Sequence, residues 1–249
     1  PKPSSAASDV YKRQTSFKPK ALVVGISGGI DSSVVSTLCA NTGRKTIVLT
    51  MPIKQIKSQH DLSLKHAKWL KDKFKNVEHH LIEMDKIFGS FSQVLNNFDN
   101  EHGFANSRAR LRMATLYQVA AANSGIVVGT GNKVEDFGVG FYTKYGDGGV
   151  DISPIADCTK TQVWELGKYL GVSEEIINSQ PTDGLWDDGR NDVQQLGMSY
   201  EDLEKAMENK DDPNYQKYLK IREKNLHKMN PIPCLLYTSD AADEGLGVD

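Results

Sequence analysis

The chain is poor in cysteine, has no long apolar run, and carries no excess of charge of either sign. Its 249 residues include three cysteines, Cys39, Cys158 and Cys234, without any Cys-x-x-Cys spacing, which argues against a disulfide framework or a structural zinc site. No stretch approaches the roughly 20 apolar residues of a membrane span. The formal net charge of -2 provides no basic field for nucleic acid or an anionic membrane. These absences predict a cytoplasmic protein whose partners include neither nucleic acid nor membrane.

Both ends of the chain look foreign to the rest. Ser4–Gln14 reads SSAASDVYKRQ and Cys234–Glu244 reads CLLYTSDAADE. Each resembles a translated sequencing adapter, and one oligonucleotide read on opposite strands can encode both peptides. We therefore expect non-native tails at residues 1–14 and 234–249 and a single domain at 15–233. Disordered native tails are the alternative.

Within the expected domain, short β-branched runs alternate with helical patterns. Buried strands are expected at Ala21–Gly25, Thr46–Met51, Val77–Ile82 and Ile126–Gly129. Helices are expected at Ser32–Ala40, Asp61–Phe74, Ser107–Ala122, Thr161–Leu170, Ser173–Ile177 and Ser199–Glu208. This order predicts an α/β fold, a doubly wound, Rossmann-like parallel sheet with helices on both faces. Ligands then bind at the carboxyl ends of the strands where the strand order reverses. A glycine-rich stretch from Phe137 to Gly149 predicts a ligand-facing loop.

The segment Gly25–Ser33, GISGGIDSS, lies between an expected strand and an expected helix. Gly28 and Gly29 allow a tight turn and a close approach of the backbone to a ligand. The backbone N–H groups of the turn and the N-terminus of the next helix form an anion site. Asp31 would repel a phosphate there unless a cation lies between them, and Mg²⁺ suits that position. A plain turn with Asp31 as helix N-cap is the alternative.

No Gly-Lys-Ser/Thr follows these glycines, so the loop is not a Walker A motif. The pattern Ser-Gly-Gly-x-Asp-Ser resembles the loop of the ATP pyrophosphatases, which have the adenine nucleotide alpha hydrolase-like fold. The resemblance implies that the loop holds pyrophosphate and that ATP is cleaved between its α- and β-phosphates. A substrate oxygen would be adenylated and then displaced by a nitrogen or sulfur nucleophile.

Further motifs follow in order. They are GTGNKVED at 129–136, GFYTKYGDGGVDISPI at 140–155, TKT at 159–161, QPTDGLW at 180–186 and the pair His227-Lys228. This set closely resembles NAD synthetase over about residues 20–233, and TKYGDGG is its most specific element. The resemblance implies the final step of NAD biosynthesis, in which ammonia amidates deamido-NAD (nicotinic acid adenine dinucleotide) to NAD. ATP would be the co-substrate and Mg²⁺ the cofactor, with AMP and pyrophosphate released after an adenylated intermediate. A homodimer whose partner chain completes the deamido-NAD site is also implied.

Carried over residue by residue, the resemblance implies three overlapping sets of site residues. The catalytic residues would be Asp31, Glu135 and Lys160, of which Asp31 and Glu135 would hold Mg²⁺. The ATP-binding residues would be Gly25, Ile26, Ser27, Gly28, Gly29, Ile30, Asp31, Ser32, Thr130, Lys160 and Thr182. The deamido-NAD residues would be Arg110, Lys144, Asp147, Asp151, His227 and Lys228. Lys160 can neutralise the charge that builds as pyrophosphate leaves.

Each assignment has an ordinary structural alternative. Lys144 and Lys160 could be solvated surface lysines, and Glu135 could mark a helix start. Arg108, Arg110 and Arg112 could form a salt-bridged helix face. Because residues two apart on a helix do not share a face, at most one or two of these arginines can reach one site. The family also has a longer acidic stretch after the Trp-x-x-Gly turn, where Val193 now stands in place of a common acid and Asp192 remains.

Three other functions remain open at this point. One is another ATP pyrophosphatase ligase, such as GMP synthetase or a tRNA thiolase. GMP synthetase, however, would lack the Thr143–Gly149 block. A tRNA thiolase should have a basic surface and often paired cysteines. Another is a non-catalytic nucleotide-binding module, which should lack Asp31, Glu135 or Lys160. The third is the synthetase domain of a truncated glutamine-dependent enzyme. No glutaminase domain is visible, so free ammonia is the expected nitrogen donor.

Overall fold

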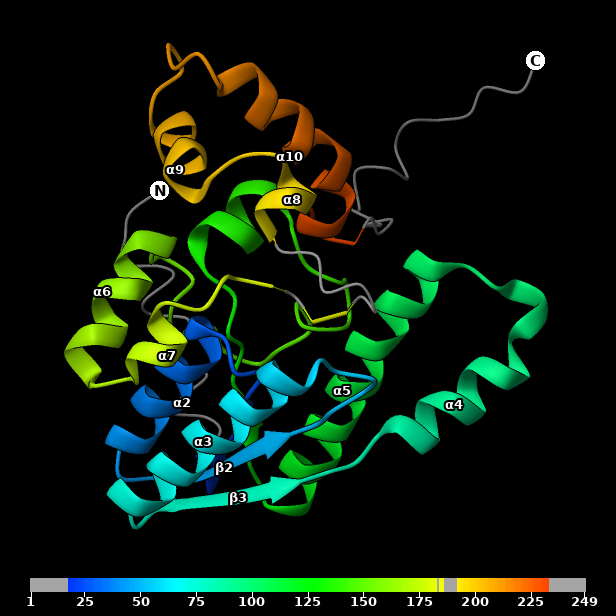
Figure 1. The fold of residues 1–249 in the computed structure, drawn as a ribbon, viewed down its shortest axis with the longest axis vertical. Coiled ribbons are helices and arrows are strands. Elements are labelled where there is room, and N and C mark those ends of the chain that lie inside the picture. The colour runs from blue at the N-terminus through cyan, green and yellow to red at the C-terminus, as the bar shows by residue number, and fades with distance from the viewer. Residues whose placement is uncertain (1–17, 183, 186–191, 233–249) are drawn as a thin grey trace, which may run out of the picture.

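The computed structural model describes residues 18–182, 184–185 and 192–232 (Figure 1). Both predicted tails, 1–14 and 234–249, lie outside the described residues, and Cys234 lies in the second of them. Trp186 and residues 189–191, which belong to the segment where the family has a longer acidic stretch, also lie outside. Within the described ranges, no helix combines the length and the apolar character that crossing a bilayer requires.

Four parallel strands form one sheet in the order β3-β2-β1-β4. The strands are β1 Ala21–Gly25, β2 Lys45–Thr50, β3 Val77–Leu81 and β4 Ile126–Val127. The register pairs Ala21 with Lys45 and Leu22 with Ile126. The prediction of a parallel sheet is confirmed, although β4 is shorter than expected. The strand order reverses at β1, because β2 and β4 lie on opposite sides of it.

All six expected helices are present, and their ends differ by a few residues from the expected ones. The helices are α2 Ile30–Asn41, α3 Lys57–Lys73, α4 Asp85–Val94, α5 Glu101–Ala122, α6 Lys160–Leu170, α7 Glu174–Ile177, α8 Asp192–Leu196, α9 Tyr200–Glu208 and α10 Tyr215–Met229. A short 3-10 helix, η1, spans Asn96–Phe98, and a π-helical turn, η2, spans Lys133–Val139. The loop expected from Phe137 therefore starts after η2.

Helices cover both faces of the sheet, as predicted, because side chains alternate along each buried strand. In β1, Leu22 and Val24 pack into the cluster formed with α2, α3 and α6. Ala21 and Val23 point the other way, into the cluster formed with α4 and α5. Figure 1 shows α5 on the opposite side of the sheet from α2 and α3.

A third apolar cluster joins the last part of the chain to η2. Val134 and Val139 of η2 pack with Leu203 and Ala206 of α9, and all four are fully buried. The half-buried Leu219 of α10 packs against the same cluster. In Figure 1, α9 and α10 lie at the top, on the far side of η2 from the strands. This packing fixes α9 beside the loops that leave β1 and β4.

Candidate active site

The Ser27–Ser32 loop leaves β1 and leads directly into α2. Gly28 has φ +93°, and a Cβ there would lie 2.5 Å from the Gln59 backbone oxygen, so only glycine fits. The Ser32 hydroxyl makes hydrogen bonds within the loop. It accepts one from the Ser27 backbone nitrogen at 3.2 Å and donates one to the Gly29 backbone oxygen at 3.0 Å. The helix N-cap is Gly29, so the alternative of Asp31 as N-cap is wrong. Asp31 lies in the first turn of α2, and it lines the cavity beside this loop.

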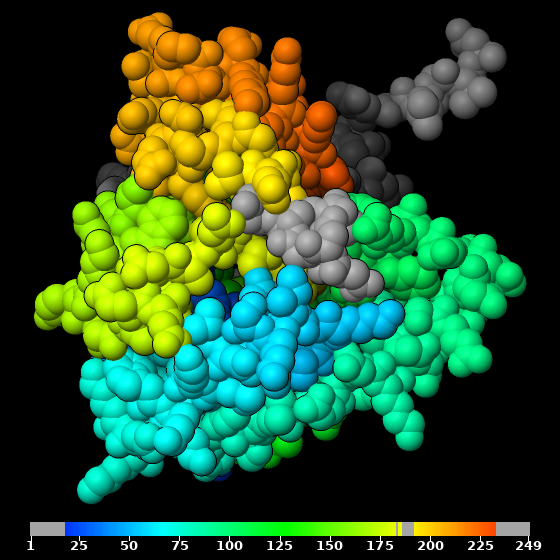
Figure 2. Space-filling view, in the orientation of Figure 1, coloured from blue at the N-terminus to red at the C-terminus, as the bar shows by residue number. Residues whose placement is uncertain are grey.

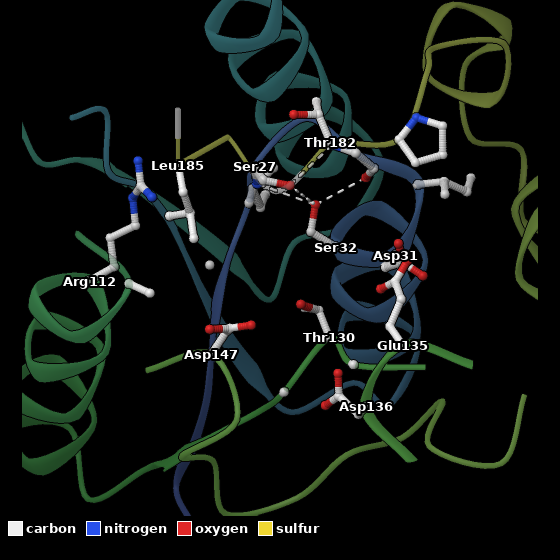
Figure 3. A pocket seen from close by; sticks show the side chains of 18 of the residues that line it. Ser27, Asp31, Ser32, Arg112, Thr130, Glu135, Asp136, Asp147, Thr182 and Leu185 are labelled. Carbon is white, nitrogen blue, oxygen red and sulfur yellow. Dashed lines mark hydrogen bonds between the residues drawn. The ribbon is translucent and has the colours of Figure 1, made fainter. Parts of the chain in front are cut away.

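A cavity of about 230 Å³ lies between this loop, the loop after β4 and the first turn of α6. In Figure 3, Ser27 and Ser32 lie near Thr182, while Asp31 and Glu135 lie side by side at one edge. In Figure 2, blue atoms of the early chain are visible at the bottom of a narrow opening between cyan and yellow-green surfaces. The residues expected to bind ATP that line the cavity are Gly25, Ile26, Ser27, Gly29, Ile30, Asp31, Ser32, Thr130, Lys160 and Thr182.

Lys160 joins the two predicted carboxylates. Its Nζ lies 2.6 Å from Asp31 Oδ2 and 2.8 Å from Glu135 Oε1. The lysine is 1% exposed, so the alternative of a solvated surface lysine is wrong. Its position is set by a capping box between Thr159 and Gln162 at the start of α6.

The charges at this junction depend on one another. Desolvation would lower the pKa of the Lys160 ammonium, but the charges of Asp31 and Glu135 outweigh it and raise the pKa above its usual range. Desolvation also works against ionised Glu135, yet Lys160 and the hydrogen bonds from Tyr200 and Asn132 lower its pKa. Burial raises the pKa of Asp31, and Lys160 opposes that rise. The lysine is therefore a permanent cation that keeps Glu135 ionised.

Two further residues bind these carboxylates, and the sequence reasoning missed both as site residues. Asn132 Nδ2 donates to Asp31 Oδ1 at 3.0 Å. The Tyr200 hydroxyl lies 2.5 Å from Glu135 Oε1 and 3.0 Å from Asp192 Oδ2. Asn132 lies inside the GTGNKVED block, which could have drawn attention to it. Tyr200 starts a helix 65 residues after Glu135, and no local pattern signals its role.

Acidic side chains outnumber basic ones in the cavity lining. Asp136, Asp147 and Asp192 line it together with Asp31 and Glu135. Burial, followed by the neighbouring carboxylates of which Asp147 is the strongest, raises the pKa of Asp136 well above its usual range. A cavity of this charge favours a cation, and one or two carboxylates with phosphate oxygens are a common setting for Mg²⁺. Among the described residues, no group of three or more His, Cys, Asp or Glu is arranged to hold a metal by itself, so phosphate oxygens would have to complete the coordination.

The residues expected to bind deamido-NAD fall into two groups. Four of them meet at the glycine-rich loop: Arg110 Nε donates to the Lys144 oxygen at 3.3 Å, Lys144 Nζ donates to the His227 oxygen at 3.1 Å, and Lys228 follows His227 on α10. None of these four lines the described cavity. They form instead a basic edge next to it, and their role in substrate binding stays a prediction.

The two expected aspartates differ from each other. Asp147 lines the cavity and accepts a hydrogen bond from the Thr143 backbone nitrogen at 3.0 Å. Asp151 Oδ2 accepts from the Val127 backbone nitrogen at 2.8 Å, and its Oδ1 accepts from the Tyr117 hydroxyl at 3.0 Å. Asp151 therefore anchors the end of β4, and the described cavity does not include it.

Comparison with known proteins identifies the family of the chain. The model of the NAD synthase family matches residues 8–232. An NH(3)-dependent NAD(+) synthetase of Alkaliphilus metalliredigens is 39% identical, with 85% of this chain and 89% of that protein covered. One from Archaeoglobus fulgidus is 34% identical, with 85% and 87% covered.

Two solved structures are similar over nearly the whole chain. An NMN synthetase from Francisella tularensis has a TM-score of 0.82 at 30% identity, covering 91% of this chain and 93% of that one. An NH3-dependent NAD synthetase from Campylobacter jejuni has a TM-score of 0.70 at 28% identity, covering 92% and 95%. The chain belongs to the NAD synthase family.

Proposed function

We propose that this protein makes NAD from deamido-NAD, ATP and ammonia, and releases AMP and pyrophosphate. The observation that carries the proposal is the junction of Asp31, Glu135 and Lys160 beside the Ser27–Ser32 loop, in a chain of this family. The curated relatives are named NH(3)-dependent NAD(+) synthetases, which supports ammonia as the nitrogen donor. The other ATP pyrophosphatase ligases and the non-catalytic module are not favoured by these likenesses.

The chain's own groups suit the two chemical steps. The backbone amides and hydroxyls of Ser27–Ser32 bind the phosphates, and Lys160 offers its ammonium to the charge that develops on the departing pyrophosphate. An oxygen of the nicotinate carboxylate bonds to the α-phosphorus while the bond between the α-phosphorus and the bridging oxygen breaks. Ammonia then bonds to the activated carboxyl carbon, AMP leaves with the carboxylate oxygen, and the nitrogen gives up one proton to solvent. Positioning and charge neutralisation provide most of the rate enhancement.

We also propose that Asp31 and Glu135 hold Mg²⁺ when ATP is bound. The fit rests on two largely buried carboxylates that converge on one cation, in a cavity with further acidic residues. When bound, the ion would offset negative charge on the phosphates. The same proposal includes the other assignments that the family resemblance implies. Thr130 and Thr182 would bind ATP. The deamido-NAD residues would be Arg110, Lys144, Asp147, Asp151, His227 and Lys228.

Steady-state formation of NAD from deamido-NAD, Mg·ATP and ammonium tests the proposed function. One AMP and one pyrophosphate should appear for each NAD. Glutamine in place of ammonium should give no NAD, which shows that free ammonia is the nitrogen donor of this chain. A folded protein that forms no amide product under these conditions rules the proposal out.

A second candidate is the matching reaction on the mononucleotide. The likeness to a protein named NMN synthetase, with a TM-score of 0.82, favours testing nicotinate mononucleotide, whose amide is NMN. The ratio of kcat/KM for the two carboxylate substrates decides between them. A ratio that favours the mononucleotide assigns NMN synthesis to this chain.

We further propose a homodimer and a cytoplasmic location. Apolar side chains lie exposed along α4 and η1: Ile87 is 52%, Val94 80% and Phe98 78% exposed. Ile87 and Val94 are two helical turns apart and so share one face of α4. Such a stripe is typical of a protein–protein contact. The described cysteines, Cys39 and Cys158, are free thiols, which suits a reducing compartment.

A further inference from the structure

The two carboxylates of the site share one partner, and each also has a partner of its own. Lys160 binds both Asp31 and Glu135. Asn132 Nδ2 donates to Asp31 at 3.0 Å, and the Tyr200 hydroxyl donates to Glu135 at 2.5 Å. The shared partner is a cation on a long flexible side chain, whereas the separate partners are neutral groups. The three donors are therefore not equivalent when a nucleotide arrives.

If the proposed function is correct, Asp31 and Glu135 would have to present their oxygens to Mg²⁺ when Mg·ATP binds, and Lys160 turns from them toward the phosphates. Its ammonium then faces phosphate oxygens, and both carboxylates lose their shortest cationic contact. A buried carboxylate without a fixed donor is free to turn to another rotamer or to take up a proton. The donors that remain decide whether Asp31 and Glu135 still face the cavity at that moment.

Tyr200 is firmly held in place. Its side chain is buried, and the Trp164 ring contacts it edge-on at 5.9 Å and 89°. Glu204, one turn further along α9, accepts hydrogen bonds from the Thr161 backbone nitrogen at 2.9 Å and from its Oγ1 at 2.6 Å. These bonds tie α9 to the first turn of α6, directly after Lys160. The Tyr200 hydroxyl therefore keeps its place when the ammonium of Lys160 moves.

The orientation of Asn132 is equally fixed. The residue is fully buried. Its Oδ1 accepts hydrogen bonds from the backbone nitrogens of Val134 and Glu135, both at 3.0 Å. Because the oxygen is committed to the start of η2, the Nδ2 group has to point the other way, toward Asp31. One amide thus links Asp31 to the backbone of Glu135.

We propose that Tyr200 and Asn132 are positioning residues, which keep Glu135 and Asp31 facing the cavity when Lys160 moves to the phosphates of ATP. Neither residue has to touch the substrate. Their contribution is largest in the nucleotide-bound state, because Lys160 still holds both carboxylates in the free protein. A residue that only stabilises the fold would contribute equally to both states.

Tyr200→Phe separates these two roles. The variant removes the hydroxyl and keeps the ring that contacts Trp164 and lies 4.8 Å from the Lys160 nitrogen. The matched control is Tyr218→Phe, from the same apolar cluster, whose hydroxyl makes no hydrogen bond to any described residue. The melting temperature is measured with and without saturating Mg·ATP, in the absence of deamido-NAD.

We expect Tyr200→Phe to melt below the wild type without nucleotide, because Asp192 also loses the hydroxyl, and in addition to lose most of the stabilisation that Mg·ATP gives the wild type. Its kcat should fall about 10-fold to 100-fold, the range for a hydrogen bond to a charged group. The KM for deamido-NAD should stay within about twofold, and Tyr218→Phe should match the wild type throughout. An unchanged Mg·ATP stabilisation together with an unchanged kcat would overturn the proposal.

Asn132→Ser provides a second, independent test. Serine can still cap the N–H groups at the start of η2, but its side chain is too short to reach Asp31. The same loss of Mg·ATP stabilisation and of kcat is expected, whereas an equal drop in melting temperature with and without Mg·ATP shows a purely structural role. If the wild type binds Mg·ATP but forms no NAD, the proposed function fails while the melting comparison still judges the two positioning residues.

Discussion

Lys160 and Asp31 form a buried ion pair, with Nζ 2.6 Å from Oδ2, although 129 positions separate them in the sequence. The pair joins the first turn of α6 to the first turn of α2. Glu135 contacts the same ammonium from η2, so three distant segments meet at one charged group. Several consequences of this junction can be measured.

Replacing Lys160 by methionine should damage both stability and activity. Two largely buried carboxylates would lose their common cation, and breaking such a pair costs up to about 3 to 5 kcal/mol. Urea denaturation measures this loss, and kcat should fall by at least about 100-fold. Lys168→Met, an exposed position on the same helix, is the matched control and should behave like the wild type. A stable, active Lys160→Met protein would contradict the role given to the junction.

Asp31→Ala and Glu135→Ala test the proposed magnesium site. If each carboxylate helps to hold Mg²⁺, each variant should lose at least about 100-fold in turnover, or roughly 2.7 kcal/mol. The dependence of kcat on the Mg²⁺ concentration should also shift to higher concentrations. Asp72→Ala, on the exposed face of α3, controls for the loss of an acidic group. Near-wild-type turnover at saturating Mg²⁺ shows that the assignment is wrong.

Gly28→Ala should abolish nucleotide binding through the backbone. A methyl group there meets the Gln59 backbone oxygen at 2.5 Å, and the positive φ of +93° adds strain. The matched control is Gly43→Ala, which has φ +71° but no atom within 4 Å of its added Cβ. Gly43→Ala isolates the conformational cost, about 1 to 2 kcal/mol. Calorimetric titration with Mg·ATP should therefore find binding in Gly43→Ala and none in Gly28→Ala, and equal affinities would refute the clash.

His66 makes stability depend on pH below neutrality. Burial lowers the pKa of its imidazole from 6.5 to about 4, and Ser36 Oγ lies 3.0 Å from Nε2. The unfolded chain takes up a proton at this group below pH 6.5, whereas the folded protein does so only near pH 4. Stability is therefore highest above pH 6.5 and falls between pH 6.5 and about 4, by on the order of 3 kcal/mol from this group.

Urea denaturation between pH 7 and pH 4.5 measures that slope. His66→Gln should flatten it, because glutamine takes up no proton. His60→Gln, on the same helix and partly exposed, should leave the slope as in the wild type. An acid slope that is the same in all three proteins would show that other groups cause it.

The proposed dimer can be tested on the exposed stripe of α4 and η1. Val94→Asp together with Phe98→Asp places two charges in a contact that should exclude water, so the dimer should dissociate to monomers. Light scattering after size-exclusion chromatography measures the mass. Tyr169→Asp, at an 87% exposed position on α6, is the control. A dimer that survives the double change uses another surface, and a monomeric wild type ends the proposal.

The strands and helices of the sheet were predictable because their signals are local. Ala21–Gly25 is a β-branched run whose side chains pack on both faces of the sheet. Such a run predicts a buried strand without information from the rest of the chain. The helices α4, α8 and α10 and the π-helical turn η2 were not predicted. α10 has only one buried residue, Tyr218, so it offers little apolar periodicity to detect.

By itself, the sequence determined the parallel sheet, the tight turn at Gly28 and the order of the family motifs, because glycine conformations and alternating apolar residues act over a few positions. Only the tertiary structure decided that Lys160 is buried between Asp31 and Glu135, that Asp151 anchors β4, and that Tyr200 and Asn132 complete the hydrogen bonds of the carboxylates. The reason is physical: burial and ion pairing depend on which segments pack together, and that packing is set by the whole chain.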